Sequence, residues 1–160
     1  MGSSLKTTLR VQNLGVMDYN EATELQLKTL HMVADGTAPP TLLLVEHPPV
    51  YTVGRTRGAD SNLLETGDVP VVQVRRGGDV TFHGPGQLVI YPIIPLHPPH
   101  QDIHKHMWRL EQASIETCKH FGLEATRDDR NTGVWVGGRK ICAIGIAAKR
   151  WVTWHGLAIN

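Results

Sequence analysis

Glycines and prolines divide much of this 160-residue chain into short apolar runs, and this punctuation limits the folds that the chain can adopt. The runs span residues 69–74, 80–82, 87–94, 133–136, 140–148 and 152–159. Short runs rich in β-branched residues and bounded by Gly or Pro are typical of strands. The first three runs predict a meander with exposed, neighbouring turns, and Gly137-Gly138 predicts a tight turn between two later strands. A further strand is expected at 41–46, between two proline pairs.

Two segments have the end signals and the apolar spacing of helices. The first follows Asp18, which has Glu21 at capping-box spacing, and it ends before Gly36. The second follows Asp102 and ends at Gly122. The predicted inner faces are Ala22, Leu25, Thr29 and Met32 in the first helix, and Met107, Leu110, Ser114, Thr117 and Phe121 in the second.

The order of these elements predicts the fold class. Strands and helices are mixed without a regular βαβ repeat, which favours an α+β fold: a mixed, mostly antiparallel sheet with packed helices. The length suits one domain, residues 1–160, and no repeat or linker divides it.

Composition narrows the class of protein. Apolar residues make up 41% and charged residues 19%, and no apolar run approaches the roughly 20 residues of a membrane span. A net charge of +1 gives no field that would gather nucleic acid or anionic lipid. Two cysteines are too few for a disulfide framework, and Met1–Lys6 has no features of a secretory signal. We expect a cytoplasmic protein, or a mitochondrial one whose presequence has been removed.

The densest chemical signal is the glycine-rich segment from Arg75 to Gln87. Glycines let the backbone approach a ligand closely, and two arginines beside free backbone N–H groups suit a carboxylate, phosphate or carbonyl oxygen. Plain hairpin turns are the alternative interpretation. It is weakened because side chains such as His83 stand where Asn, Ser or Asp would suffice for a turn.

A second signal lies in the strand expected at 140–148. Period-two geometry puts Lys140 and Cys142 on one face and Ala143 and Gly145 on the other. Lys140 is either a snorkelling end residue or a desolvated amine that lowers the pKa of a neighbouring thiol. Cys142 is either that thiol or, as its small neighbours favour, a buried apolar residue. Gly145 indicates a close approach by a ligand or by backbone.

The remaining candidates carry weaker signals. Cys118 is expected to be structural, within the second helix. Histidines crowd between His97 and His106, which favours a solvated loop and helix start over a metal site. Neither a G-x-S-x-G motif nor a P-loop is present, so neither a hydrolase triad nor nucleotide chemistry has support. The sequence predicts no metal and no cofactor.

The two motifs occur together in a known family. They are Arg76-Gly77-Gly78-Asp79-Val80-Thr81-Phe82-His83-Gly84-Pro85-Gly86-Gln87 and Lys140-Ile141-Cys142-Ala143-Ile144-Gly145, followed by His155-Gly156-Leu157-Ala158-Ile159-Asn160. Upstream blocks at 46–52 and 132–135 match as well. With these blocks in order, the chain resembles the lipoyl(octanoyl) transferases. The resemblance implies the fold shared with biotin and lipoate protein ligases.

The resemblance also implies a function. Members transfer octanoyl from the thioester of acyl carrier protein to a lysine of lipoyl domains, through a Cys acyl-enzyme and without ATP. The implied acceptors are lipoyl domains of 2-oxoacid dehydrogenase complexes and the glycine cleavage H protein. Lys140 corresponds to the lysine that lowers the nucleophile's pKa. The implied substrate-binding residues are Arg76, Gly77, Gly78, Asp79, Val80, Thr81, Phe82, His83, Ala143, Ile144, Gly145, Gly156, Leu157 and Ala158.

The nucleophile of the family lies in a Pro-Cys-Gly motif downstream of the block that ends at Asn160. We therefore expect that this chain holds the pocket and the lysine but does not turn over alone. Cys142 occupies a strand position that need not be cysteine. Two alternatives stay open: a binding module for an acyl group or carrier protein, and an ATP-dependent lipoate ligase.

Overall fold

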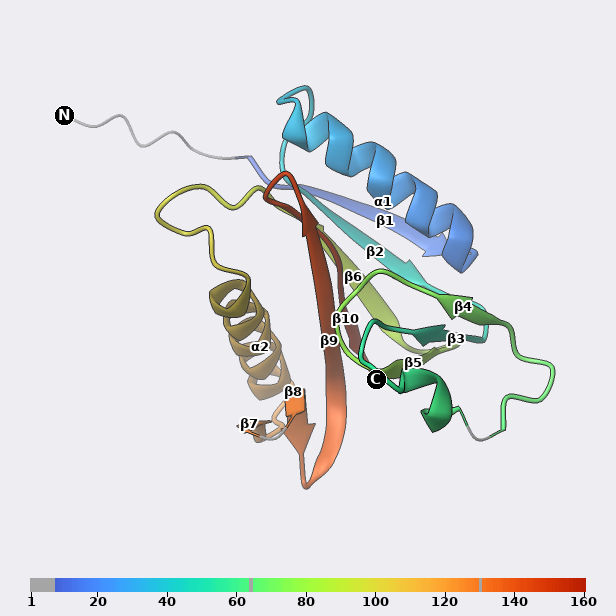
Figure 1. Ribbon diagram of the computed structural model, residues 1–160. Helices are drawn as coiled ribbons and strands as arrows, with labels where there is room; N and C mark the ends of the chain where they lie inside the picture. Colours follow the sequence, from blue (N-terminus) through green and yellow to red (C-terminus); the bar gives the residue numbers. More distant parts are fainter. Residues whose placement is uncertain (1–7, 64, 130) are drawn as a thin grey trace.

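A computed structural model describes residues 8–63, 65–129 and 131–160, and its main feature is a seven-stranded sheet (Figure 1). The strand order is β1-β2-β6-β10-β9-β8-β7. The strands are β1 (Arg10–Val16), β2 (Thr41–Glu46), β6 (Leu88–Ile93), β7 (Ala125–Asp128), β8 (Asn131–Val136), β9 (Arg139–Lys149) and β10 (Val152–Ile159). Only the β1–β2 pair is parallel in this sheet as described. The predicted α+β class with a mostly antiparallel sheet is confirmed.

A second sheet overturns the predicted meander. Its order is β4-β3-β5, with β3 (Val50–Val53) between β4 (Val71–Gln73) and β5 (Val80–His83). The middle strand is parallel to β4 and antiparallel to β5. The three runs between 69 and 94 do form strands, but they do not pair with one another. The prediction failed because the short strand β3 was missed, and because β6 pairs instead with β2 and β10.

Both helices begin where their capping residues predict. The Asp18 carboxylate accepts hydrogen bonds from the backbone N–H groups of Asn20 and Glu21 at the start of α1 (Tyr19–Ala34). Asp102 accepts one from Lys105 N–H, 2.9 Å away, at the start of α2 (Ile103–His120). A side-chain oxygen at this position satisfies N–H groups that the first helical turn leaves free. A short 3-10 helix, η1 (Ala59–Asn62), lies between β3 and β4.

The buried faces of the helices differ from the predicted ones. In α1 the buried residues are Tyr19, Ala22, Gln26, Leu30 and Val33. In α2 they are His106, Glu111, Ser114 and Cys118. Of the predicted residues, Ala22 and Ser114 are buried, and Leu25 and Leu110 are partly buried against the two cores, whereas Met32 and Phe121 are exposed. Polar residues at three buried positions, Gln26, His106 and Glu111, hid the true faces, because apolar periodicity does not register a polar side chain that is buried.

The helices divide the sheet into two cores. Helix α1 packs over β10, β6 and β2, and α2 packs over β9, β7 and β8. Leu30, Leu43 and Ile93 are fully buried in the first core, while Val134 and Cys142 are fully buried in the second. Both cysteines are buried, as the sequence indicated.

Strand β1 was not predicted. It forms one edge of the sheet, and its Val11 and Val16 side chains are exposed.

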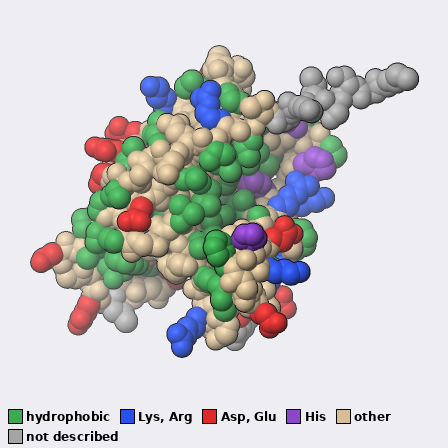
Figure 2. Space-filling model, turned by 180° about the vertical axis from the view of Figure 1, so that it is seen from behind, with side chains coloured by type: hydrophobic (Ala, Val, Ile, Leu, Met, Phe, Trp, Pro, Cys, Tyr) green, Lys and Arg blue, Asp and Glu red, His purple; other side chains and the backbone are tan. Residues whose placement is uncertain are grey.

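From behind, hydrophobic side chains gather over the middle of the molecule (Figure 2). In the described ranges no helix is long and apolar enough to cross a membrane. The segment 1–7, on which the expected absence of a signal depends, lies outside the described residues.

Gly156 offers a test of how tightly β10 fits against β6. A Cβ at this position would overlap Ile90 O and lie 2.5 Å from Pro92 Cδ. We expect Gly156→Ala to lower the free energy of unfolding by about 2 kcal/mol or more, as overpacking of a rigid site does. Gly77→Ala is the matched control, because its Cβ would meet Ile146 O at 3.7 Å, an ordinary contact. Chemical denaturation measures both, and equal losses in the two variants would contradict the packing argument.

Candidate active site

The two motifs, about seventy residues apart in sequence, meet at β9. Gly77 N–H donates to Ile146 O, 3.1 Å away. A Cβ at Gly145 would lie 2.8 Å from Gly77 O and 3.1 Å from Arg76 Cδ. The predicted close approach at Gly145 is therefore made by the Arg76 segment. A side chain at position 145 would push this segment away.

Around this contact lie an open groove of about 740 Å³ and an inner cavity of about 30 Å³ that share part of their walls. The predicted residues along the groove are Arg76, Gly77, Gly78, Asp79, Val80, Thr81, Phe82, Lys140, Ala143, Ile144 and Gly145. Those along the inner cavity are Arg76, Thr81, His83, Ala143, Ile144, Gly145, Gly156, Leu157 and Ala158. Every predicted site residue thus lines one space or both. The groove has the size of a small-molecule site, roughly 300 to 1,000 Å³.

Arg76 is the buried cation of the site. Its side chain donates from Nη2 to Thr52 O at 2.9 Å and to Thr52 Oγ1 at 2.8 Å, and from Nη1 to Gly77 O at 3.0 Å. Burial lowers the pKa of Arg76 from its ordinary value. In the part of the chain that the structure describes it forms no ion pair. A guanidinium fixed this way against a shared cavity wall favours a ligand that brings a negative or carbonyl oxygen.

Buried aromatic side chains line the inner cavity from the side of α1. His83 stacks on Tyr19 with ring centroids 5.8 Å apart, and its Nδ1 lies 2.7 Å from Gln87 Oε1. Tyr91 hydroxyl lies 2.7 Å from His47 Nε2. Burial lowers the pKa of His83 to about 4, so its ring is neutral at pH 7. The inner end therefore offers neutral hydrogen-bonding groups beside Arg76.

His155 has the most unusual environment of the described residues that line the cavity. Its φ of 56° lies in the left-handed region, which costs an ordinary residue roughly 1–2 kcal/mol. Gln26 Oε1 accepts its backbone N–H at 2.8 Å, and its ring stacks on Trp154 at 4.0 Å. Neither ring nitrogen has a described hydrogen-bond partner, and burial lowers its pKa to about 3. His155 and the three residues that follow it in β10, Gly156, Leu157 and Ala158, all line the inner cavity.

A β-bulge overturns the predicted faces of β9. Lys140 pairs with Trp135 and Cys142 with Val134, so Ile141 is the extra residue. Because Val134 and Trp135 point to opposite faces of the sheet, Lys140 and Cys142 do as well. Lys140 lies on the groove side, where Nζ donates to Thr132 O at 3.2 Å and lies 5.0 Å from the centre of the Trp135 ring.

Cys142 lies on the other side, in the α2 core. It is fully buried, and Ser114 Oγ is 3.5 Å from its Sγ. Burial raises the pKa of this thiol to about 11. The charge of Lys140 lowers that pKa only slightly, less than any other group lowers or raises it. Neither Cys142 nor Cys118 lines the groove or the inner cavity. The alternative of a Lys140–Cys142 pair is therefore not supported by the geometry.

Sequence reasoning missed several residues of the site. Tyr19, Val89 and Tyr91 line the inner cavity, and Thr132 lines the groove. Thr52, which holds Arg76, lies on the missed strand β3. Tyr19 directly follows a capping residue and Tyr91 lies within an apolar run, so neither carried a local signal. The histidines from His97 to His104 lie in the loop and at the helix start, and none of them lines either space.

The fold agrees with what comparison with known proteins finds. Residues 18–160 match the family described as the lipoyl protein ligase A/B catalytic domain. In fold the chain is similar to a putative lipoate protein ligase from T. acidophilum, solved with bound lipoic acid. The TM-score is 0.68 at 15% identity, over 94% of this chain and 67% of that one. The chain belongs to the lipoyl protein ligase A/B catalytic-domain family.

Within this family, the chain is similar in sequence to curated proteins named octanoyltransferase. The protein of that name from Thermoanaerobacter sp. (strain X514) is 45% identical over 159 residues, covering 94% of this chain and 68% of the relative. The one from Geobacter metallireducens is 46% identical over 152 residues, covering 95% and 70%. The chain thus spans somewhat more than two thirds of the length of these relatives.

Protonation of His155 provides a test of its burial. The unfolded chain binds a proton at this histidine near pH 6.5, whereas the folded chain binds it only near pH 3. Stability therefore decreases as the pH falls below about 6.5, by up to about 1.4 kcal/mol per unit for this group. We expect His155→Asn, which tolerates the left-handed backbone, to reduce this slope between about pH 6 and pH 4.5. The exposed His120→Asn should not, and denaturation curves at each pH measure both.

Alkylation provides a second test, of the thiols. Because only the thiolate reacts, a buried thiol with its pKa raised to about 11 should be alkylated far more slowly than a free cysteine at neutral pH. Mass spectrometry should find Cys142 unmodified by iodoacetamide in the folded chain and modified after denaturation. Rapid labelling of Cys142 at native pH, with the far-ultraviolet circular dichroism unchanged, would contradict its position in the core.

Proposed function

We propose that this chain forms the acyl pocket and the lysine side of an octanoyltransferase that modifies a lysine of lipoyl domains. The observation that carries the proposal is the convergence of both motifs on one groove, with Lys140 on its wall. Identity of 45% to a protein named octanoyltransferase supports the same reaction class. The donor that we propose is octanoyl-acyl carrier protein, because a thioester is already activated and needs only a nucleophile.

We propose that the groove and the inner cavity together bind the acyl substrate. We propose that the acyl chain lies along Ala143 and Leu157, and that Arg76 and the N–H groups of the glycine-rich segment hold its carbonyl oxygen. Hydrogen-bond donors aimed at such an oxygen stabilise the negative charge that develops on it during acyl transfer. Lys140 lines the groove, and we propose that it acts on a thiol or an amine that enters from solvent.

The attacking thiol is not one of the two cysteines of this chain, in our proposal. Cys118 and Cys142 are buried outside the groove, and the raised pKa of Cys142 leaves it in the unreactive form. We therefore expect acyl binding by the chain but no acyl-enzyme on Cys142. An ATP-dependent ligase receives less support, since the ligase used for comparison is only 15% identical while the octanoyltransferases are 45–46% identical.

A pair of alanines in β9 separates binding in the groove from general effects. Ala143 lines both spaces, whereas Ala148 is exposed on the same strand and lines neither. We expect octanoyl-pantetheine to bind the chain, Ala143→Leu to weaken that binding at least tenfold, and Ala148→Leu to leave it unchanged. Isothermal titration calorimetry measures all three. Absence of binding to the folded chain, or equal loss in both variants, would contradict the proposed pocket.

Intact-mass spectrometry tests the thiol. After incubation with octanoyl-acyl carrier protein and a lipoyl domain, we expect no octanoyl adduct on the chain and no modified lipoyl domain. Octanoyl transfer that disappears in Cys142→Ser would overturn this part of the proposal, and it would show that the thiol becomes exposed. ATP-dependent adenylation of lipoate would favour the ligase instead.

A further inference from the structure

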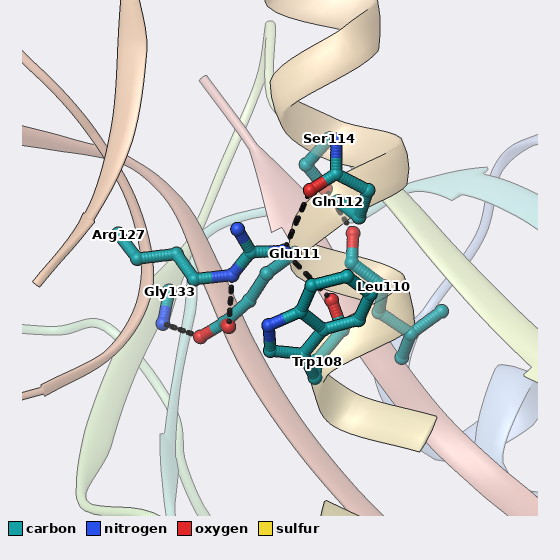
Figure 3. A network of polar contacts seen from close by, with 7 residues as sticks. All are labelled: Trp108, Leu110, Glu111, Gln112, Ser114, Arg127 and Gly133. Atoms are coloured by element: carbon teal, nitrogen blue, oxygen red, sulfur yellow. Dashed lines mark hydrogen bonds and ion pairs between the residues drawn. The ribbon is translucent and has the colours of Figure 1, made fainter. Parts of the chain in front are cut away.

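A buried carboxylate on α2 is directed at the strand that faces Lys140 (Figure 3). Glu111 Oε1 accepts the backbone N–H of Gly133 at 3.0 Å, and Oε2 accepts Arg127 Nε at 3.0 Å. Only 12% of its side-chain surface is exposed. Both oxygens of this buried carboxylate thus accept hydrogen bonds, which offset the cost of removing it from water.

Arg127 fixes the carboxylate from its other side. Its Nη2 donates to Trp108 O at 3.1 Å and to Gln112 Oε1 at 2.9 Å, and its guanidinium lies 4.4 Å from the centre of the Trp108 ring. Figure 3 shows Gly133 and Arg127 next to each other at the Glu111 carboxylate, with Trp108 on the other side. The carboxylate therefore has a single well-defined orientation.

Gly133 lies directly beneath the side chain of Lys140. A Cβ there would lie 2.5 Å from Cys142 O, 3.3 Å from Lys140 Cε and 3.5 Å from Lys140 Cδ. The preceding carbonyl, Thr132 O, accepts the Lys140 amine. The backbone that Glu111 holds is thus the backbone on which the lysine rests, at the point where Ile141 interrupts the pairing of β8 with β9.

We propose that Glu111 is a positioning residue for Lys140, acting from α2 through the Thr132–Gly133 backbone. The bulge leaves the ladder locally disrupted, so regular strand pairing does not fix β8 here. The carboxylate supplies the missing restraint: it anchors Gly133 N–H, which sets the direction of Thr132 O and keeps the amine over the Trp135 ring. The importance of this position for catalysis rests on the proposed function, but the restraint itself does not.

The test is Glu111→Gln in the whole chain, read at Lys140 by NMR. In glutamine one of the two acceptor oxygens becomes an NH2 group, which donates. Because the remaining oxygen favours the cationic Arg127, the contact with Gly133 N–H is lost. Lys140 methylene protons near the Trp135 ring should show a ring-current shift in the parent chain. We expect this shift to diminish in Glu111→Gln, and labelling of Lys140 by an amine reagent to rise about fivefold, the population change expected from loss of one hydrogen bond.

Glu116→Gln is the matched control, because it makes the same change on an exposed residue of α2 whose carboxylate accepts from Gln112 instead. It should leave Lys140 unaffected. A Glu111→Gln chain that is merely less stable, with the Lys140 signals and labelling unchanged, would overturn the proposal, as would an equal effect of Glu116→Gln.

Should Glu111→Gln not fold, Arg127→Gln tests the same restraint from the other side. It removes the ion pair that orients the Glu111 carboxylate and so weakens the bond to Gly133, and a smaller change of the same sign is expected at Lys140. No change at Lys140 in a folded Arg127→Gln chain would then overturn the proposal. Because no acyl substrate is used, failure of the octanoyltransferase assignment does not affect these outcomes.

Discussion

The contact between the Arg76 segment and β9 is the constraint on which the rest of the site depends. Gly77 N–H donates to Ile146 O, and the segment passes so near Gly145 that a side chain there has no room. This approach makes one wall for both the groove and the inner cavity, and it places a buried guanidinium on that wall. Thr52 completes the arrangement from the small sheet by accepting from Arg76.

The bulge in β9 decides the chemistry of the two polar residues beside it. Without Ile141 as an extra residue, Lys140 and Cys142 would share a face, and an amine next to a thiol would favour the thiolate. With it, the amine faces the groove and the thiol lies in the core, where burial raises its pKa to about 11. A single added residue thus separates two groups that the strand period would have joined.

Buried polar residues hold the backbone at two places where it departs from regular geometry. Gln26 holds the left-handed turn at His155, and Glu111 holds Gly133 beside the bulge. In both places a helix contributes a side-chain oxygen that replaces a partner the sheet does not provide. The same two residues lay outside the predicted helix faces, because apolar periodicity does not register a buried polar side chain.

The sequence by itself determined the strands of the β8–β9–β10 region, the caps of both helices, the α+β class and the two motifs that meet at the groove. These follow from local chemistry: turn glycines, capping carboxylates, alternating apolar residues and two motifs. The pairing of β3 with β4 and β5, the bulge, and the positions of Tyr19, Tyr91 and Thr52 were decided by the tertiary structure. They depend on contacts between residues far apart in the chain, and no local pattern encodes which strand a run will meet or where one residue will be left unpaired.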